Sequence, residues 1–148
     1  MDVREIGDRL AIEDLLVRYC YALDRQDWPA FERLFTADAR LDFTAFGGPR
    51  GDPATLRAFL EPILRSLHGA QHAISTLWIT LDGDRARVQT AAQVALTART
   101  TEGRLQTTFS GLWYHDTLLR GADGWRIHER VQQKSWTSTA IAVEPPAP

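Results

Sequence analysis

The change of pattern at Gly69 constrains the fold of this chain more than any other feature of its sequence. Before Gly69, apolar residues recur at helical spacing, whereas the segments after it are long and rich in β-branched and aromatic residues. Three turn signals divide this second half: DGD at 82–84, TEG at 101–103 and GADG at 121–124. Turns of this kind join antiparallel neighbours, so we predict four long strands connected as consecutive hairpins.

Three helices are predicted in the first half. The longest covers residues 5–23, the second is the short segment DWPAFERLF with Asp27 as its N-cap, and the third is DPATLRAFLEPILRSL, in which Pro62 predicts a kink or a break. The segment ARLDFTAF predicts a strand that ends at the turn residues of GGPRGD. The apolar stripe of the first helix consists of Ile6, Leu10, Leu15, Leu16, Tyr19, Cys20 and Leu23.

Helices followed by long strands predict an α+β fold. We expect the three helices to pack against one face of a strongly curved, antiparallel (mixed) sheet and to enclose an apolar pocket, the kind of site that binds small molecules. Residues 1–140 are expected to form one domain, and the proline-rich residues 141–148 an irregular tail.

Composition excludes several classes of function. A net charge of −2, with arginines spread along the chain, gives no reason to expect a nucleic acid or an anionic membrane as partner. No segment approaches the roughly 18 apolar residues of a membrane helix. The charged start MDVREIGDRL lacks the apolar region of a signal peptide, and the single cysteine, Cys20, excludes an internal disulfide. These features favour a cytoplasmic protein.

The segment RYCYALDRQDW carries an acidic residue on an apolar helix face. Asp24 lies one turn after Cys20 and two turns after Leu16, on the stripe that should meet the core. Burying a carboxylate is costly unless another group pairs with it, so Asp24 needs a partner from elsewhere in the chain.

Three stretches resemble a known family in their order and spacing. They are IEDLLVRYCYALDRQDWPAFERLFTADARLDF, QHAISTLWITLDGDRARVQT and GLWYHDTLLRGADGWRIHER, and together they cover nearly the whole chain. The chain resembles the SnoaL-like branch of the nuclear transport factor 2 fold. This resemblance implies a cone-shaped α+β domain that often pairs through its sheet, and hence a homodimer or a higher homo-oligomer.

A narrower resemblance concerns scytalone dehydratase, bile acid 7α-dehydratase and hexachlorocyclohexane dehydrochlorinase. These proteins have an Asp at the end of the first helix and a His on the strand after the third, and Asp24 and His72 match these positions. The resemblance implies that His72 is a general base and that Asp24 orients it. A carboxylate on one ring nitrogen fixes the tautomer and stabilises the imidazolium that forms. The alternative is an exposed Asp24 and a structural His72.

Tyr19 and Arg130 are two further catalytic candidates. Tyr19 lies about 140° from Asp24 around the helix and matches a tyrosine of the bile acid enzyme, but it could equally pack between helix and sheet. Arg130 resembles an arginine that several relatives direct into the pocket. In a regular strand, however, Trp125, Ile127, Glu129 and Val131 share one face. Arg130 then falls on the other face unless a bulge intervenes, and Glu129 could be the inward residue instead.

The chain departs from these relatives at Leu23 and Phe43, where the resemblance places two tyrosines of scytalone dehydratase. The substrate therefore does not transfer from that enzyme. Aromatic residues expected to line the pocket are Trp28, Phe43, Trp78 and Phe109. No set of metal ligands stands out, so neither a metal nor a cofactor is expected. The glycines at 47, 48 and 51 suggest a mobile flap near the pocket mouth, and His115 favours a surface or interface position.

The sequence thus favours a cofactor-independent lyase, dehydratase-like, or an isomerase that acts on a hydrophobic cyclic molecule. In this hypothesis His72 removes a proton, Asp24 holds His72, and Tyr19 or Arg130 assists the departing or enolising oxygen. A non-catalytic module for ligand binding or dimerisation would also explain the missing tyrosines. An oxygenase small subunit is a third possibility, which the Asp24–His72 pair speaks against.

Overall fold

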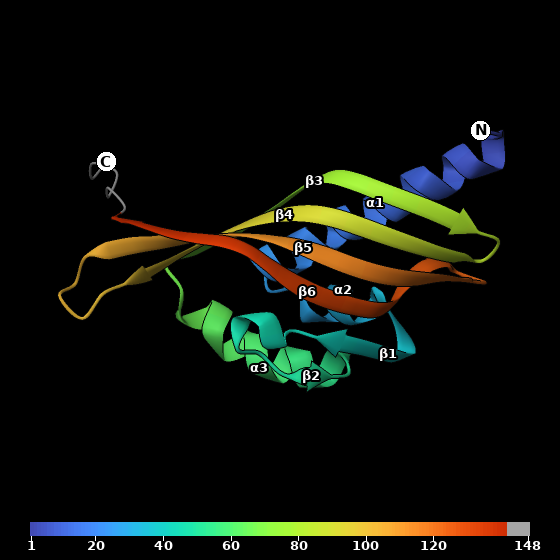
Figure 1. The fold of residues 1–148 in the computed structure, drawn as a ribbon. Coiled ribbons are helices and arrows are strands. Elements are labelled where there is room, and N and C mark those ends of the chain that lie inside the picture. The colour runs from blue at the N-terminus through green and yellow to red at the C-terminus, as the bar shows by residue number, and fades with distance from the viewer. Residues whose placement is uncertain (142–148) are drawn as a thin grey trace, which may run out of the picture.

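The computed structural model describes residues 1–141, which begin with the long helix α1 (Val3–Asp24). Asp2 caps this helix by accepting a hydrogen bond from the Glu5 N–H at 2.8 Å. The N-terminal turns project past the edge of the sheet (Figure 1), so Ile6 and Leu10, which the spacing predicts on the buried stripe, are 46% and 61% exposed. The rest of the helix meets the sheet and buries Ile12, Leu15, Leu16, Tyr19, Cys20, Ala22 and Leu23.

Two shorter helices, α2 (Trp28–Arg33) and α3 (Pro53–Ser66), begin in the same way. Asp27 and Asp52 each accept a hydrogen bond from the backbone N–H three residues later, which confirms the predicted cap of α2. Pro62 lies inside α3, and the helix continues through it. The predicted break is therefore wrong, because a proline removes one backbone donor while the buried face of α3 still packs on the core.

The remaining elements form a six-stranded sheet, with a 3-10 turn, η1 (Thr44–Phe46), between the first two strands. The strand order is β2-β1-β6-β5-β4-β3, and only the β1–β6 pair is parallel. The strands are β1 (Phe35–Asp42), β2 (Arg50–Gly51), β3 (Gly69–Asp82), β4 (Arg85–Arg99), β5 (Leu105–Gly121) and β6 (Gly124–Ile141).

The strand predicted over ARLDFTAF is shifted towards the N-terminus. It ends at Asp42, whose carboxylate accepts hydrogen bonds from the Thr44 N–H at 3.0 Å and hydroxyl at 2.6 Å. These bonds turn the chain into η1, because an Asp side chain that bonds the backbone two residues on stabilises a turn.

All three predicted hairpins are present. The strands β3 and β4 meet at DGD, where Gly83 has a φ of 58°, and β4 and β5 meet at TEG, where Gly103 has a φ of 80°. Both values lie in the left-handed region that glycine adopts without strain. The third hairpin joins β5 to β6 between Gly121 and Gly124.

A β-bulge in β3 decides which side chains face the helices. Thr76 has a φ of 52°, and the pairing with β4 passes from Ser75 to Leu77 without it. His72 lines the cavity described below, and Ile74, Leu77, Ile79 and Leu81 pack on the core. Because the extra residue shifts the alternation by one position, the side chain of Trp78 points away from the core and is 73% exposed.

A second bulge lies in β6. Ile127 pairs with Leu118 and Glu129 pairs with Thr117, so His128 is the additional residue. Ile127 is buried before the bulge and Arg130 is buried after it. The bulge therefore places the Arg130 side chain inside the protein. In a regular strand this side chain would lie on the face opposite Ile127.

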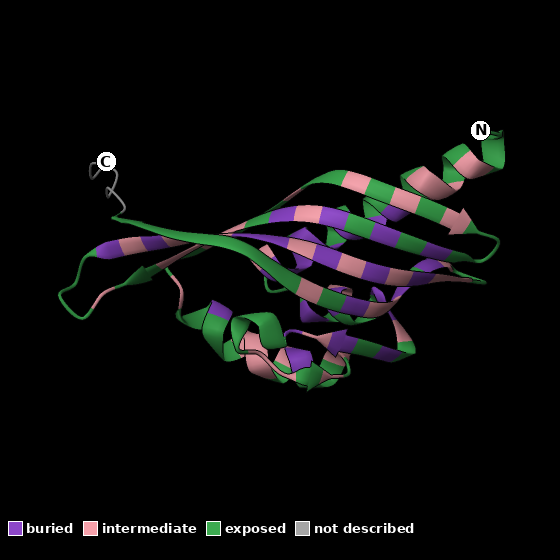
Figure 2. Cartoon of the chain, in the orientation of Figure 1, coloured by how far each residue is buried: buried purple, intermediate pink, exposed green. Residues whose placement is uncertain are grey.

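The helices cover one face of the curved sheet, as Figure 1 shows, and buried and exposed positions alternate along the strands in Figure 2. This arrangement confirms the predicted α+β cone with a mixed sheet. Within residues 1–141 no helix is both long and apolar enough to cross a membrane. Of the predicted irregular tail, Ile141 is the last residue of β6, and the remainder lies outside the described residues.

Candidate functional site

Asp24 and His72 are joined by three short contacts. The imidazole Nδ1 of His72 lies 2.6 Å from Asp24 Oδ1. The backbone N–H of His72 also donates to both carboxylate oxygens, at 3.1 and 2.9 Å. The end of α1 is thus tied to β3, and the partner that Asp24 requires is both the ring and the backbone of His72.

This geometry selects one tautomer of the His72 ring. An ionised carboxylate only accepts hydrogen bonds, so Nδ1 is the donor and Nε2 keeps a free lone pair. The His72 side chain is 10% exposed and lines a cavity, so the available nitrogen belongs to a largely enclosed site. A neutral imidazole held in this way can accept a proton from a bound molecule.

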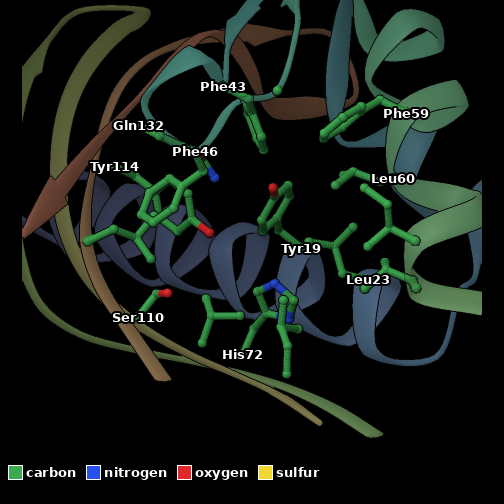
Figure 3. A pocket seen from close by; sticks show the side chains of 16 residues that line it. Tyr19, Leu23, Phe43, Phe46, Phe59, Leu60, His72, Ser110, Tyr114 and Gln132 are labelled. Atoms are coloured by element: carbon green, nitrogen blue, oxygen red, sulfur yellow. The ribbon is translucent and has the colours of Figure 1, made fainter. Parts of the chain in front are cut away.

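The cavity beside His72 has a volume of about 290 Å³. Most of its wall is apolar, and Figure 3 shows aromatic and aliphatic side chains converging on it from helices and strands. Phe46 and Gly48 bring the glycine-containing loop to the wall, at the place where a flap was expected; its movement stays a prediction. The lining residues are Tyr19, Leu23, Phe43, Phe46, Gly48, Phe59, Leu60, Ile63, Leu64, His72, Val94, Leu96, Ser110, Leu112, Tyr114 and Gln132.

Tyr19 is both packed between helix and sheet and part of the cavity wall. Its ring contacts those of Phe31, Phe35 and Tyr114, with centroid distances of 5.9, 6.4 and 5.8 Å. Burial raises the pKa of Tyr19 to about 12, so the phenol keeps its proton at neutral pH. Arg130 lies close enough to the Tyr19 hydroxyl to oppose this rise of the pKa in part, but no hydrogen bond of good geometry joins them.

Arg130 lies behind this wall and does not line the cavity. Its guanidinium donates two hydrogen bonds of 2.7 Å to the carboxylate of Asp116. The guanidinium carbon lies 4.1 and 4.0 Å from the ring centroids of Tyr19 and Tyr114. Burial alone would lower the pKa of Arg130, but the ion pair with Asp116 outweighs it and the pKa is raised. Arg130, which was expected to point into the pocket, instead contacts two tyrosines of the cavity wall.

Three of the four aromatic residues expected in the pocket lie elsewhere. Trp78 faces outward because of the bulge at Thr76, and Phe109 is 40% exposed on the opposite face of β5 from the lining residues Ser110 and Leu112. Trp28 is buried in the core against Phe31, with ring centroids 5.7 Å apart. The fourth residue, Phe43, does line the cavity.

Four polar residues at or behind this wall were not predicted from the sequence. Ser110 and Tyr114 follow the alternation of β5 and could have been found from it, and Asp116 shares their face. Gln132 lies beyond the bulge of β6, so its inward orientation has no signal in the local pattern. Ser110, Tyr114 and Gln132 give the largely apolar cavity wall a polar patch, and Asp116 lies behind it.

The described residues offer no ready site for a metal or a reactive thiol. Within residues 1–141, no group of three or more His, Cys, Asp or Glu side chains could hold a metal ion. Burial raises the pKa of Cys20 to about 11, so its sulfur stays a thiol and is a poor nucleophile at neutral pH.

Fold and site together define a cone-shaped α+β domain with a histidine–aspartate pair in the wall of its cavity. The family model of the SnoaL-like domain matches residues 4–131, and the chain belongs to this family. It is also similar to the uncharacterized protein Rv2910c of Mycobacterium tuberculosis, with 36% identity over 135 residues that cover 90% of each chain.

Solved structures resemble the chain in fold. A candidate scytalone dehydratase from Novosphingobium aromaticivorans is 20% identical, with a TM-score of 0.77 over 90% of this chain and 88% of that one. The LinA-type3 hexachlorocyclohexane dehydrochlorinase of Novosphingobium barchaimii is 15% identical, with a TM-score of 0.80 over 100% of both chains. At these identities the likeness shows that the fold is of the nuclear transport factor 2 type.

Proposed function

We propose that the protein is a cofactor-independent lyase or isomerase that removes a proton from carbon in a hydrophobic cyclic molecule. The observation that carries this proposal is the 2.6 Å hydrogen bond between Asp24 and His72 at the wall of an apolar cavity. The names of the two structural neighbours, a dehydratase and a dehydrochlorinase, describe eliminations and agree with the lyase alternative.

In the proposed reaction, His72 Nε2 takes a proton from a carbon next to an activating group. The electron pair of the broken C–H bond then forms a C=C bond, and a neighbouring substituent leaves with its own bonding pair. In the isomerase alternative, the electron pair of the broken C–H bond forms the C=C bond of an enolate while the carbonyl π pair moves to oxygen. The His72 imidazolium then returns its proton to another carbon as the carbonyl forms again. The carboxylate of Asp24 stabilises the imidazolium that either route produces.

Tyr19 is the proposed hydrogen-bond donor in the cavity. Its phenol keeps its proton, and its neighbour Arg130 can only donate hydrogen bonds, so the phenol O–H can donate to an oxygen or halide that gains negative charge. The buried guanidinium of Arg130 lies against the Tyr19 ring and favours charge development there without touching the ligand.

The proposal is tested with elimination substrates of two kinds, a cyclic β-hydroxy ketone (3-hydroxycyclohexanone) and a cyclic polychloride (γ-hexachlorocyclohexane). Formation of the unsaturated ketone is measured by its absorbance, and chloride is measured directly. We expect His72→Ala and Asp24→Asn each to lower turnover by about 10²–10⁴-fold, the usual contribution of a general base. His115→Ala is the matched control, because His115 lies on the other face of β5 and bonds Gln133.

Turnover of His72→Ala near that of the natural protein would show that His72 is not the base. Binding of both compounds with no turnover of either, together with unchanged binding by His72→Ala, would instead favour a ligand-binding module. Circular dichroism verifies that each variant keeps its fold.

We also propose that the chain pairs with a second copy of itself through the outer face of the sheet. We define this outer face by Trp78 of β3, Phe109 of β5, and Val131 and Trp136 of β6. These side chains are 73%, 40%, 44% and 44% exposed. Large apolar side chains gathered on one face are typical of a protein–protein interface.

A further inference from the structure

Unpaired polar atoms gather at one end of the cavity wall. In residues 1–141, the buried side-chain atoms without a hydrogen-bond partner are Arg9 Nε, Tyr19 OH, Thr90 Oγ1, Arg130 Nη1 and Gln132 Oε1. All except Arg9 belong to one cluster around Tyr114. Each unpaired buried polar group is destabilising, so such a concentration is unusual in a part of the fold with only a structural role.

The strand register places this cluster. Tyr114 pairs with Gln132 on β6 and with Thr90 on β4, so the three side chains stand in one row across the sheet. Tyr19 of α1 lies over the same row, with its ring centroid 5.8 Å from that of Tyr114. Tyr19, Tyr114 and Gln132 all line the cavity, whereas Thr90 and Arg130 lie behind it.

We propose that Gln132 and Tyr19 form a polar subsite that binds a hydroxyl group of the substrate and that Gln132 determines this specificity. The Tyr19 hydroxyl can donate a hydrogen bond, and the Gln132 Oε1 accepts one. A hydroxyl group both accepts and donates, so it satisfies both atoms at once. A methyl group in the same place satisfies neither and leaves both atoms buried and unpaired.

The subsite is separate from the histidine. His72 pairs with Val94, which pairs with Ser110, so His72 belongs to a different row of the sheet from Thr90, Tyr114 and Gln132. In Figure 3 the labelled side chains of Gln132 and Tyr114 lie on a different side of the cavity from His72. The bound hydroxyl group therefore lies across the cavity from His72, where it is the oxygen to which Tyr19 donates in the proposed reaction, and the apolar wall fits the ring system.

This inference deepens the proposed function by giving the substrate class, an apolar ring system with a hydroxyl at one end, but its test depends only on binding. The probes are 2-naphthol and 2-methylnaphthalene, which differ in one group of similar size. Equilibrium dialysis against the natural protein should show tighter binding of 2-naphthol, by about 5–30-fold for 1–2 kcal/mol of hydrogen bonding. In Gln132→Leu the preference for 2-naphthol should fall several-fold, since the acceptor is gone and only the Tyr19 donor remains.

Two further variants complete the test. Gln133→Leu is the matched control, because Gln133 is the next residue of β6 and does not line the cavity. Its side chain forms a hydrogen bond with His115. The preference for 2-naphthol should therefore persist in this variant. Tyr19→Phe removes the donor and should reduce the preference even if Gln132→Leu does not fold.

Equal binding of the two probes by the natural protein would overturn the proposal, because it would mean that water satisfies the unpaired atoms equally well. A preference that is undiminished in Gln132→Leu would overturn it too. The preference should remain in His72→Ala, so a failure of the proposed proton transfer can be distinguished from a failure of the subsite.

Discussion

Asp116 is the residue whose replacement we expect to destabilise the protein most. Its carboxylate is the ion-pair partner of Arg130, and the side chains of the two residues are 0% and 1% exposed. Asp116→Asn keeps the shape but leaves a buried guanidinium without its counter-charge. Loss of one partner of a buried ion pair costs about 3–5 kcal/mol, and urea unfolding followed by tryptophan fluorescence measures this loss.

A double replacement distinguishes the contribution of charge to stability from that of packing. Arg130→Met combined with Asp116→Leu removes both charges and keeps apolar bulk between Tyr19 and Tyr114. We expect it to recover most of the stability that Asp116→Asn loses, because well-packed apolar residues can replace a buried ion pair with little cost. A loss below about 1 kcal/mol in Asp116→Asn would mean that water reaches the guanidinium, contrary to its burial.

The N-terminal half of α1 depends on a single carboxylate that joins it to the β5–β6 hairpin. Asp8 Oδ1 accepts hydrogen bonds from Trp125 Nε1 at 3.0 Å and from Arg120 at 2.6 Å. These bonds, that of Trp125 first, lower the pKa of Asp8 below its usual value. We expect Asp8→Asn to lose about 1–2 kcal/mol of unfolding free energy at pH 7.

The pH dependence of this loss has a definite sign. A lowered pKa in the folded protein means that the stabilisation is complete above the ordinary carboxyl pKa and is lost as the pH falls through the lowered value. The difference between the natural protein and Asp8→Asn should therefore shrink below about pH 4, the ordinary range of a carboxyl group. Asp14→Asn is the control on the same helix. Asp14 pairs with Arg18 and both side chains are exposed, so its replacement should cost less than about 1 kcal/mol at pH 7.

Elements with local signals could be predicted from the sequence, and elements that depend on distant pairing could not. The caps of the helices and the glycines of the hairpins act on the next few residues, so Asp27 and Gly83 could be recognised in the sequence alone. The bulges at Thr76 and His128 depend on how neighbouring strands pair. The outward position of Trp78 and the burial of Arg130 therefore needed the structure.

The residues of the candidate site also differ in whether the sequence alone could reveal them. Asp24 and His72 were matched through a resemblance, and the hydrogen bond that joins them is consistent with that match, while their catalytic role stays a prediction. No pattern pointed to Gln132, because the bulge before it shifts the alternation of β6. In this fold, a one-residue insertion in a strand exchanges cavity and surface positions for everything that follows it.

For the whole molecule, the curvature of the sheet separates two apolar surfaces. The inner one is covered by helices and forms the cavity, and the outer face carries Trp78, Phe109, Val131 and Trp136. Strand register aligns Trp78 with Gln89, His115 and Val131 in one row, so the exposed side chains share one face. The indole of Trp136 lies so close over Gly111 that a Cβ atom there would overlap it, which fixes this ring against the sheet.

We expect size-exclusion chromatography with light scattering to give about twice the 16.7 kDa of one chain at micromolar concentration. A charge in the middle of the outer face should separate the copies, because an unpaired buried charge at an interface is strongly unfavourable. Val131→Glu should therefore give the mass of one chain and leave the cavity intact. Leu10→Glu introduces the same charge at a residue that is 61% exposed on α1, away from the outer face, and should leave the pair unchanged. A pair that Leu10→Glu separates and Val131→Glu does not would assign the interface to α1 instead.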